Sequence, residues 1–417
     1  ISPAGAMEAR PAEPLALDYV VDAEGQIRLR TDESPEQILS LFGGVPHVDL
    51  LFLYPPVGAQ RVNMGRALWE KDARFREAML QCDAVAKPLL PQPLVEVLYP
   101  DPCEESMYEE VIHTAQYALP CLFAFQFALT RLWEAASAEP TYVVGHSLGE
   151  FMAAVVAGVL TMPQAMLLVC ERANLMHATV SSGAMMAVRA SADVVRRAIE
   201  AAGCEGVAVV AAENSADSTS VSGDWTILSR VLKSLPAGTK TSRVKASHAD
   251  HSPMMGAVAS QLRAKAAAIC AAAPPRRAAV LWVSTVTGAA VADDAAHPAY
   301  WERQALEPVR FIDAVHSVLE LHQAAQQRAD GPWAPFSISR KCLGIEMGHG
   351  MLCTFCDSIS QQRKYEDVEF LSTLKHTKTA SAEELHHSVH ETIEKVMESK
   401  RAERLQMTLL APFLPVA

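Results

Sequence analysis

The stretch Tyr142-Val143-Val144-Gly145-His146-Ser147-Leu148-Gly149-Glu150 decides the fold of this chain. An apolar run followed by a serine between two glycines is typical of a sharp strand-to-helix turn that presents a nucleophile. Gly145 and Gly149 suit such a turn, because a Cβ atom at either position would meet the neighbouring strand or helix. The next helix directs its N–H groups and the positive end of its dipole to the place where an oxyanion forms. We therefore predict an α/β fold with Ser147 as a nucleophile.

The composition narrows the class of protein. The 417 residues are 50% apolar and 20% charged, which suits a globular chain with room for two packed units. The formal charge of −12 argues against nucleic acid as a partner, since phosphate binding requires a basic surface. Nine cysteines at irregular spacing predict a reducing, cytoplasmic location rather than a disulfide scaffold. Residues 1–7 lack the basic start and apolar core of a signal peptide.

One long uncharged segment, Phe151–Cys170, is nominally long enough to cross a membrane. Pro163 and Gln164 interrupt the segment, and the serine turn precedes it directly. Two buried helices that meet near Pro163, with this proline at a first helical position, explain the segment better. The sequence therefore predicts no membrane span.

Periodicity and composition divide the chain into four parts. Residues 1–47 are rich in proline and acidic residues and are predicted to form an N-terminal linker. An α/β core begins with a buried strand at residue 48 and occupies 48–182 and 247–358. Residues 183–246 follow the order strand, helix, strand, strand, helix, strand, which is that of a ferredoxin-like unit. The polar tail 359–417 is predicted to be a linker with an amphipathic C-terminal helix.

A serine nucleophile needs a base, and the best candidate is His251. It lies in Ser247-His248-Ala249-Asp250-His251-Ser252-Pro253, where the ferredoxin-like unit returns to the core. As a metal pair, His248 and His251 would lack a third ligand nearby. Four other residues could in principle hold zinc: Cys342, His349, Cys353 and Cys356. A single Cys-x-x-Cys is a weak signal, so no metal site is predicted.

Six motifs occur together along the chain: Gly145–Glu150, Asn214, Ser220–Asp224, His251–Pro253, Trp301–Phe311 and Glu346–His349. Together they resemble the malonyl-CoA:acyl carrier protein transacylase family, as it occurs in the acyltransferase domains of type I polyketide synthases. The resemblance covers about residues 48–358. It implies an α/β hydrolase-like core with a parallel sheet and an inserted ferredoxin-like subdomain.

The resemblance assigns roles to the residues that match the family's motifs. Ser147 matches the nucleophile and His251 the base, and Gln304 falls where the family orients that histidine with a backbone carbonyl. Arg172 matches the arginine that holds the free carboxylate of a malonyl group. A planar guanidinium suits this task because it can bind a carboxylate through two parallel hydrogen bonds.

The chain departs from the family in the loop Tyr54-Pro55-Pro56-Val57-Gly58-Ala59-Gln60, where Val57 replaces a glutamine. The backbone N–H of Val57 is still expected to form an oxyanion hole with that of Leu148, because this donor does not depend on the side chain. Leu119, just before Pro120, replaces a second pocket glutamine. The resemblance thus implies a less polar acyl pocket than is usual.

The tetrapeptide His248-Ala249-Asp250-His251 departs as well, since malonyl-selective polyketide domains usually carry His-Ala-Phe-His. Asp250 is smaller than phenylalanine and negatively charged. It neither excludes an α-methyl group nor favours an acyl carboxylate, unless it points away. Malonyl remains the favoured acyl group because Arg172 is present. The predicted specificity residues are Asp250, His248, Leu119 and Asn214.

The predicted reaction moves a malonyl-type acyl group from CoA to the phosphopantetheine thiol of an acyl carrier protein through an acyl-serine. No bound cofactor is expected. The expected partners are the carrier protein, a CoA thioester and neighbouring synthase domains. Two alternatives stay open. One is a hydrolase that uses the same serine and histidine to release the acyl group to water. The other is a non-catalytic docking module, which the substitutions at Val57 and Leu119 suggest.

Overall fold

The computed structural model describes most of the chain: residues 19–21, 27–29, 45–179, 181–245, 248–272, 274, 278–291, 297–326, 338–365, 367–374 and 382–410. Most of the predicted linker 1–47 lies outside these residues. Its described part includes a short antiparallel pair of strands, β1 (Tyr19–Val21) and β2 (Ile27–Leu29). No helix in the described ranges is long and apolar enough to cross a membrane.

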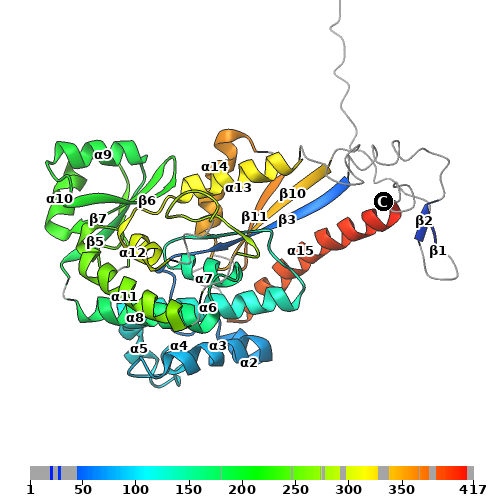
Figure 1. The fold of residues 1–417 in the computed structure, drawn as a ribbon, viewed down its shortest axis with the longest axis horizontal. Coiled ribbons are helices and arrows are strands. Elements are labelled where there is room, and N and C mark those ends of the chain that lie inside the picture. Colours follow the sequence, from blue (N-terminus) through cyan, green and yellow to red (C-terminus); the bar gives the residue numbers. More distant parts are fainter. Residues whose placement is uncertain are drawn as a thin grey trace, which may run out of the picture.

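Within the described residues, the core is a sheet of five parallel strands in the order β11-β10-β3-β4-β9 (Figure 1). The strands are β3 (Val45–Tyr54), β4 (Tyr142–Gly145), β9 (Leu281–Trp282), β10 (Ile338–Glu346) and β11 (Val368–Ser372). β3 contains the buried strand predicted from residue 48, and β4 leads to Ser147. Because parallel strands share a carboxyl edge, the loops that follow β3, β4 and β10 come together there.

Helices cover both faces of this sheet (Figure 1). Leu50 and Phe52 of β3 pack on one face and Leu51 and Leu53 on the other, as the two-residue period of a strand requires. The helices whose buried side chains join the apolar cluster of the first face are α2 (Arg66–Lys71), α3 (Ala73–Ala86), α4 (Leu94–Leu98), α5 (Glu105–Val111), α6 (Ala115–Ala135), α7 (Gly149–Val156), α8 (Met162–Ala178), α11 (Gly256–Ala272) and α12 (Pro298–Leu306). The opposite face is covered by α13 (Phe311–Gln326) and α14 (Met351–Arg363). A short 3-10 helix, η1 (Pro253–Met255), precedes α11.

The uncharged segment 151–170 belongs to two buried helices, α7 and α8, as predicted. Thr161 caps α8: its side chain accepts the N–H of Gln164, and the side chain of Gln164 accepts the N–H of Thr161. This reciprocal pair satisfies two N–H groups that would otherwise have no helical partner. Pro163 follows in the first turn, where its missing N–H costs no hydrogen bond.

The inserted unit has the predicted order of elements: β5 (Gly183–Val188), α9 (Ala192–Ala201), β6 (Ala208–Ser215), β7 (Ser218–Asp224), α10 (Trp225–Lys233) and β8 (Thr241–Arg243). Its four strands pair antiparallel in the order β6-β7-β5-β8. Both helices pack into one apolar cluster on a single face of this sheet. The arrangement confirms the ferredoxin-like subdomain.

The turn between β4 and α7 has no space for side chains at its two glycines. A Cβ atom on Gly145 would lie 2.2 Å from the carbonyl carbon of Gly149, and one on Gly149 would lie 2.1 Å from the carbonyl oxygen of Tyr54. Ser147 itself has φ of 53°, a left-handed conformation that non-glycine residues rarely adopt. Such strain is typical of functional sites, and here it places the serine beyond the end of β4.

The predicted end of the core at residue 358 needs correction. β11 lies within the predicted linker 359–417 and pairs with β10 along its whole length. α15 (Ala382–Leu410) packs Val389 and Val396 into the same apolar cluster as Leu50. All five residues of β11 are only partly buried, so the strand lacks the apolar run that would reveal it in the sequence.

Candidate active site

Ser147 and His251 form a hydrogen-bonded pair at the carboxyl edge of the parallel sheet. Ser147 Oγ lies 2.7 Å from His251 Nε2, and His251 Nδ1 lies 3.0 Å from the carbonyl oxygen of Glu307. A carbonyl oxygen can only accept, so Nδ1 carries the hydrogen. In the neutral ring, Nε2 therefore accepts from the serine hydroxyl. The pair has the geometry of a nucleophile and its general base.

Burial keeps His251 neutral. The residue is 2% exposed, and burial is the main cause that lowers its pKa to about 4. The nearby carboxylate of Asp250 opposes this shift, while the charge of Arg172 adds to it. At neutral pH the ring is consequently uncharged, and Nε2 can take up a proton from Ser147.

The predicted position of the orienting carbonyl needs correction. The carbonyl that receives the hydrogen bond of His251 belongs to Glu307, the residue that follows α12, and not to Gln304. Gln304 acts through its side chain: Nε2 donates to the carbonyl oxygen of Ser147 over 2.8 Å, and Oε1 accepts from Arg172 over 2.7 Å. A backbone acceptor has no side-chain signature, so the sequence located it only to within one turn of helix.

Arg172 and Asp250 form a buried ion pair. Arg172 Nη2 donates to Asp250 Oδ1 over 2.9 Å, and Nη1 donates to Gln304. The two charged side chains are 3% and 8% exposed. The Nε atom of Arg172 is enclosed and has no hydrogen-bond partner within the described part of the chain. Both terminal nitrogens that were predicted to hold a substrate carboxylate are thus already bonded inside the protein.

A pocket of about 450 Å³ lies in front of Ser147, between the core and the inserted sheet. The core contributes the loop after β3, and the inserted unit contributes residues of β5, β6 and β7 together with Arg243 of β8 and Lys245. Asp250 and Asn214 line the pocket, as expected of specificity residues. Among the described lining residues are Pro55, Pro56, Val57, Met185, Ala187, Ala212, Ser220 and His251.

Two of the predicted specificity residues do not reach this pocket in the described structure. Leu119 is 4% exposed and packs in the apolar cluster of the core. His248 is also buried, and its Nε2 lies 3.2 Å from the carbonyl oxygen of Thr179. Position in a motif determines the chain segment but not the direction of the side chain, so the role of these two residues in specificity stays a prediction.

The predicted oxyanion donors flank the nucleophile. Leu148 immediately precedes α7, and Val57 lines the pocket in the loop after β3. Neither backbone N–H donates to another group within the described residues. Gln126 holds this loop in place, because its Nε2 donates to the carbonyl oxygen of Pro55 over 2.7 Å. The sequence analysis missed Gln126, although a buried glutamine within an apolar helix is a usable signal.

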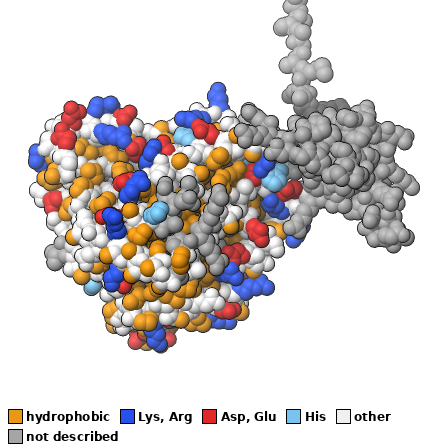
Figure 2. Space-filling view, viewed as in Figure 1, with side chains coloured by type: hydrophobic (Ala, Val, Ile, Leu, Met, Phe, Trp, Pro, Cys, Tyr) orange, Lys and Arg blue, Asp and Glu red, His pale blue; other side chains and the backbone are white. Residues whose placement is uncertain are grey.

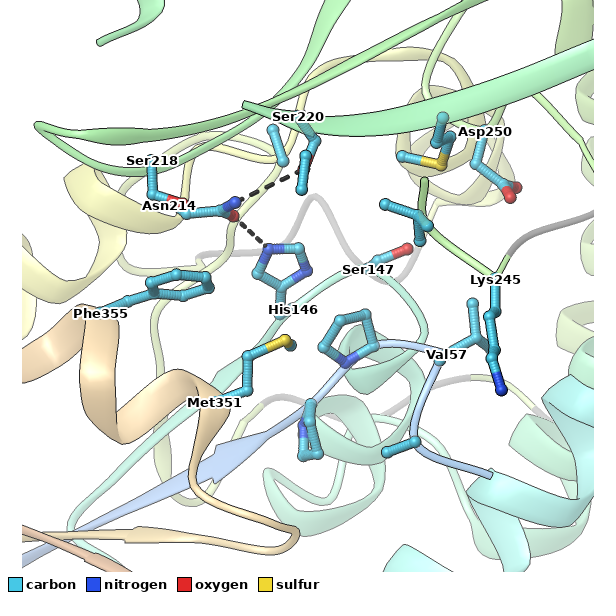
Figure 3. Close-up of a pocket in the computed structure, with 18 of the residues that line it drawn as sticks. Val57, His146, Ser147, Asn214, Ser218, Ser220, Lys245, Asp250, Met351 and Phe355 are labelled. Atoms are coloured by element: carbon cyan, nitrogen blue, oxygen red, sulfur yellow. Dashed lines mark hydrogen bonds between the residues drawn. The ribbon is translucent and has the colours of Figure 1, made fainter. Parts of the chain in front are cut away.

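His146 links the nucleophile turn to the inserted unit. Its Nε2 donates to Asn214 Oδ1 over 2.8 Å, and Asn214 Nδ2 lies 3.5 Å from Ser220 Oγ. Figure 3 shows His146 and Asn214 on one side of Ser147 and Asp250 on the other. Burial lowers the pKa of His146 to about 4, so this ring is neutral as well. The two halves of the pocket are therefore held together next to the serine.

Glu150 stabilises the helix that begins at the nucleophile. The residue is fully buried, and burial raises the pKa of its carboxyl group to about 7. Its oxygens accept hydrogen bonds from the backbone N–H of Thr285 and from the hydroxyl group of Tyr300. Thr285 also donates to the carbonyl oxygen of Gly145 over 2.8 Å. These bonds secure both sides of the turn that carries Ser147.

The described residues hold no group of three or more His, Cys, Asp or Glu side chains that could bind a metal ion. Cys353 and Cys356 are buried free thiols in α14. Glu346 accepts the N–H of Cys353 over 3.0 Å at the start of that helix. Arg61 lies 3.0 Å from His349 Nε2. The residues weighed as zinc ligands thus take part in packing and in hydrogen bonds at the edge of the sheet.

The fold and the site together define a serine enzyme of the α/β class whose pocket is closed on one side by a ferredoxin-like insert. Residues 51–326 match the family described as acyl transferase domain, and the chain belongs to this family. It is an acyltransferase domain.

Relatives at the level of sequence are much longer proteins. The chain is 34% identical over 319 residues to polyketide synthase GfsB of Streptomyces halstedii, a match that spans 76% of this chain and 6% of the relative. It is 35% identical over 266 residues to mycoketide-CoA synthase of Mycobacterium tuberculosis, spanning 64% of this chain and 6% of the relative. The chain thus corresponds to a small part of each of these proteins.

Solved structures share the fold. The acyltransferase domain from the second module of the salinomycin polyketide synthase is 29% identical, with a TM-score of 0.66 over 82% of this chain and 72% of that domain. The malonyl CoA-acyl carrier protein transacylase of Clostridium perfringens is 20% identical, with a TM-score of 0.66 over 85% of this chain and 99% of that one. The second similarity supports the hydrolase-like core with its ferredoxin-like subdomain and nothing finer.

Proposed function

We propose that this domain transfers an acyl group from a CoA thioester to the phosphopantetheine thiol of an acyl carrier protein, with Ser147 as the acylated residue. The proposal rests above all on the 2.7 Å contact between Ser147 Oγ and the neutral Nε2 of His251. A hydroxyl group attacks a thioester only when a base removes its proton, and a buried neutral imidazole can do so at pH 7.

The proposed first half-reaction acylates the enzyme. Ser147 Oγ attacks the thioester carbonyl carbon while His251 Nε2 takes the hydroxyl proton, and a C–O bond forms. The oxyanion accepts hydrogen bonds from the N–H groups of Val57 and Leu148. When the tetrahedral intermediate collapses, the C–S bond breaks and His251 returns the proton to the departing CoA thiolate.

The second half-reaction follows the same path in reverse. The carrier thiol loses its proton to His251, its sulfur attacks the acyl-serine, and the C–O bond breaks. Ser147 then regains its proton from the imidazolium. The carbonyl of Glu307 fixes the ring throughout, because its hydrogen bond to Nδ1 keeps Nε2 directed at the serine.

The resemblance to malonyl transferases predicts a malonyl-type acyl group held by Arg172. That role requires guanidinium N–H groups directed at the pocket, whereas Arg172 is 2% exposed and each of its terminal nitrogens already donates a hydrogen bond, one to Gln304 and one to Asp250. The proposed function therefore specifies an acyl thioester without requiring a free carboxylate on it.

Neighbouring domains of a synthase are the proposed setting of the reaction, since the relatives are polyketide synthases of which this chain matches a small part. A reducing, cytoplasmic location also belongs to the proposal. It is supported by the nine cysteines, all of which are free thiols.

The hydrolase alternative is tested by giving the acyl-enzyme a choice of acceptor. The purified chain is mixed with propionyl-CoA or malonyl-CoA and with pantetheine, which carries the same thiol arm as a carrier protein. We expect acyl-pantetheine to form at least about tenfold faster than free acid, and neither product to form with Ser147→Ala. Faster release of free acid by the unaltered chain would establish the hydrolase instead.

A further inference from the structure

Asp250 stands between the pocket and Arg172. Asp250 lines the pocket. Arg172 is not among the described residues that line the pocket, and it is 2% exposed. The carboxylate of Asp250 bonds Arg172 Nη2 over 2.9 Å, and Gln304 bonds Nη1 over 2.7 Å. Asp250 thus presents to Arg172 the same chemical group that a malonyl substrate would present.

The backbone around Asp250 is held on both sides. Ala249 is fully buried, and its carbonyl oxygen accepts from Ser252 Oγ over 2.6 Å. A Cβ atom on Gly183 would lie 2.6 Å from the nitrogen of Ala249, so β5 packs directly against this segment. The N–H of His251 donates to the carbonyl oxygen of Ala305 over 3.2 Å. Asp250 therefore cannot leave Arg172 by a movement of its segment without disturbing the base.

Arg243 and Lys245 also line the pocket, but at the ion pair of Arg172 and Asp250 the electrostatics count against a carboxylated acyl group. The positive charge of Arg172 is already compensated by Asp250, so a substrate carboxylate gains little from the pair and faces a like charge at close range. Repulsion between like charges is strong in a buried site because water does not screen it. An acyl group without a carboxylate leaves the ion pair intact and meets the apolar side chains of Met185, Ala187 and Val57.

We propose that Asp250 occupies the position on Arg172 where a substrate carboxylate would bind, and that it thereby selects acyl thioesters that lack a free carboxylate. This inference rests on the proposed acyl transfer at Ser147 and names its substrate class. Gln304 contributes to the selection, because it holds the other terminal nitrogen of Arg172 and is itself tied to the carbonyl of Ser147.

Two matched pairs of substrates test the proposal on the unaltered chain. Acetyl-CoA and malonyl-CoA differ by one carboxylate, as do propionyl-CoA and methylmalonyl-CoA. The initial rate of acyl-enzyme formation is measured for each by rapid quenching and intact mass. We expect the uncarboxylated member of each pair to acylate Ser147 at least as fast as its partner. Faster acylation by the carboxylated member in either pair would overturn the proposal.

A substitution at Asp250 tests whether this residue determines the choice between carboxylated and uncarboxylated acyl groups. Asp250→Asn keeps the size of the side chain and an oxygen for Arg172 but removes the negative charge. We expect the malonyl-to-acetyl ratio of kcat/KM to rise by about tenfold or more, because the cation becomes available to a substrate carboxylate. The matched control is Asp193→Asn, the same change at a side chain that is 76% exposed on α9, which should leave the ratio unchanged. An unchanged ratio in a folded Asp250→Asn chain would contradict the role of Asp250.

The two claims fail in different ways. If no thioester acylates Ser147, the proposed function falls and the inference falls with it. If malonyl-CoA and methylmalonyl-CoA acylate Ser147 faster, acyl transfer stands and the inference alone is wrong. The wild-type rates decide this even if Asp250→Asn does not fold.

Discussion

One arginine–aspartate pair lies within the parallel sheet and another lies beyond its carboxyl edge, and the two pairs are bonded differently. In the first half of β3, Asp49 receives two hydrogen bonds from Arg340, over 2.9 and 2.8 Å, and lies 2.8 Å from His322 Nδ1. Beyond the carboxyl edge, Asp250 receives a single bond from Arg172, whose Nε has no partner among the described residues.

The difference separates a pair that stabilises the fold from one that shapes a site. Asp49 is completely buried and uses both of its oxygens on groups of β10 and α13. Asp250 uses one oxygen on Arg172 and lines the pocket. A bidentate pair with a fully buried carboxylate contributes to the fold alone, whereas a carboxylate that is bonded once and lines a pocket also acts on the ligand that enters it.

The largest effect should come from the base at the carboxyl edge. His251→Gln removes the proton acceptor of Ser147, and we expect the acylation rate to fall by about 10²- to 10⁴-fold. Rapid-quench mass analysis with propionyl-CoA measures this rate. His47→Gln, the same change beside Asp49, is the matched control and should leave the rate unchanged. A loss of less than about tenfold in His251→Gln would show that another group takes the proton.

The next effect belongs to the pair in β3. Asp49→Ala removes the carboxylate that faces Arg340 and His322, and we expect the free energy of unfolding to fall by about 3–5 kcal/mol. Urea denaturation measures the loss, and the acylation rate of the folded fraction should not change. Asp313→Ala, at an exposed pair with Arg310, should cost less than about 1 kcal/mol. Equal losses in the two variants would remove the distinction between the pairs.

The pH dependence of the acylation rate should be a smaller effect than the two above, and it should appear only at acidic pH. The folded pKa of His251 is about 4, below the ordinary value of 6.5, so the base stays neutral down to mildly acidic pH. We expect the acylation rate at pH 5.5 to stay within about twofold of that at pH 7.5. The same shift means that the stability contributed by the neutral ring is complete above pH 6.5 and declines as the pH falls towards 4. A rate midpoint near 6.5 would place His251 in water rather than in a buried site.

The smallest effect concerns His47, whose side chain is 38% exposed. Its hydrogen bond to Asp49, followed by that to Glu403, raises its pKa. Stability from the charged ring is therefore fully present below about pH 6.5 and is lost as the pH rises through the raised value. We expect His47→Gln to cost at most about 1 kcal/mol at pH 6 and less at pH 8.5, by urea denaturation. A larger cost at pH 8.5 would reverse the assigned sign.

Much of the fold was predictable because it depends on local patterns. The serine turn, the break at Pro163 and the βαββαβ order each follow from residues close together in the chain. β11 was not predictable in this way, since a half-buried edge strand has neither a clear alternation nor an apolar run. Its place is decided by the exposed edge of β10, which is distant in sequence.

The candidate site likewise combines features that local sequence reveals with features that only the tertiary structure decides. Ser147 and His251 were predicted from the chemistry of their side chains, and Arg172 from the resemblance to a known family. The acceptor at Glu307 is a backbone atom, and the partner of Arg172 is decided by the direction in which Asp250 points. The sequence supplied the residue types at the site, and the tertiary structure determined which of them pair.

The most direct test of the account is the site of acylation. The chain is exposed briefly to propionyl-CoA, digested, and analysed by peptide mass spectrometry. We expect one propionyl group on the peptide that contains Ser147, and none after the same treatment of Ser147→Ala. A propionyl group on another residue, or an equal amount of acyl-enzyme in Ser147→Ala, would contradict it.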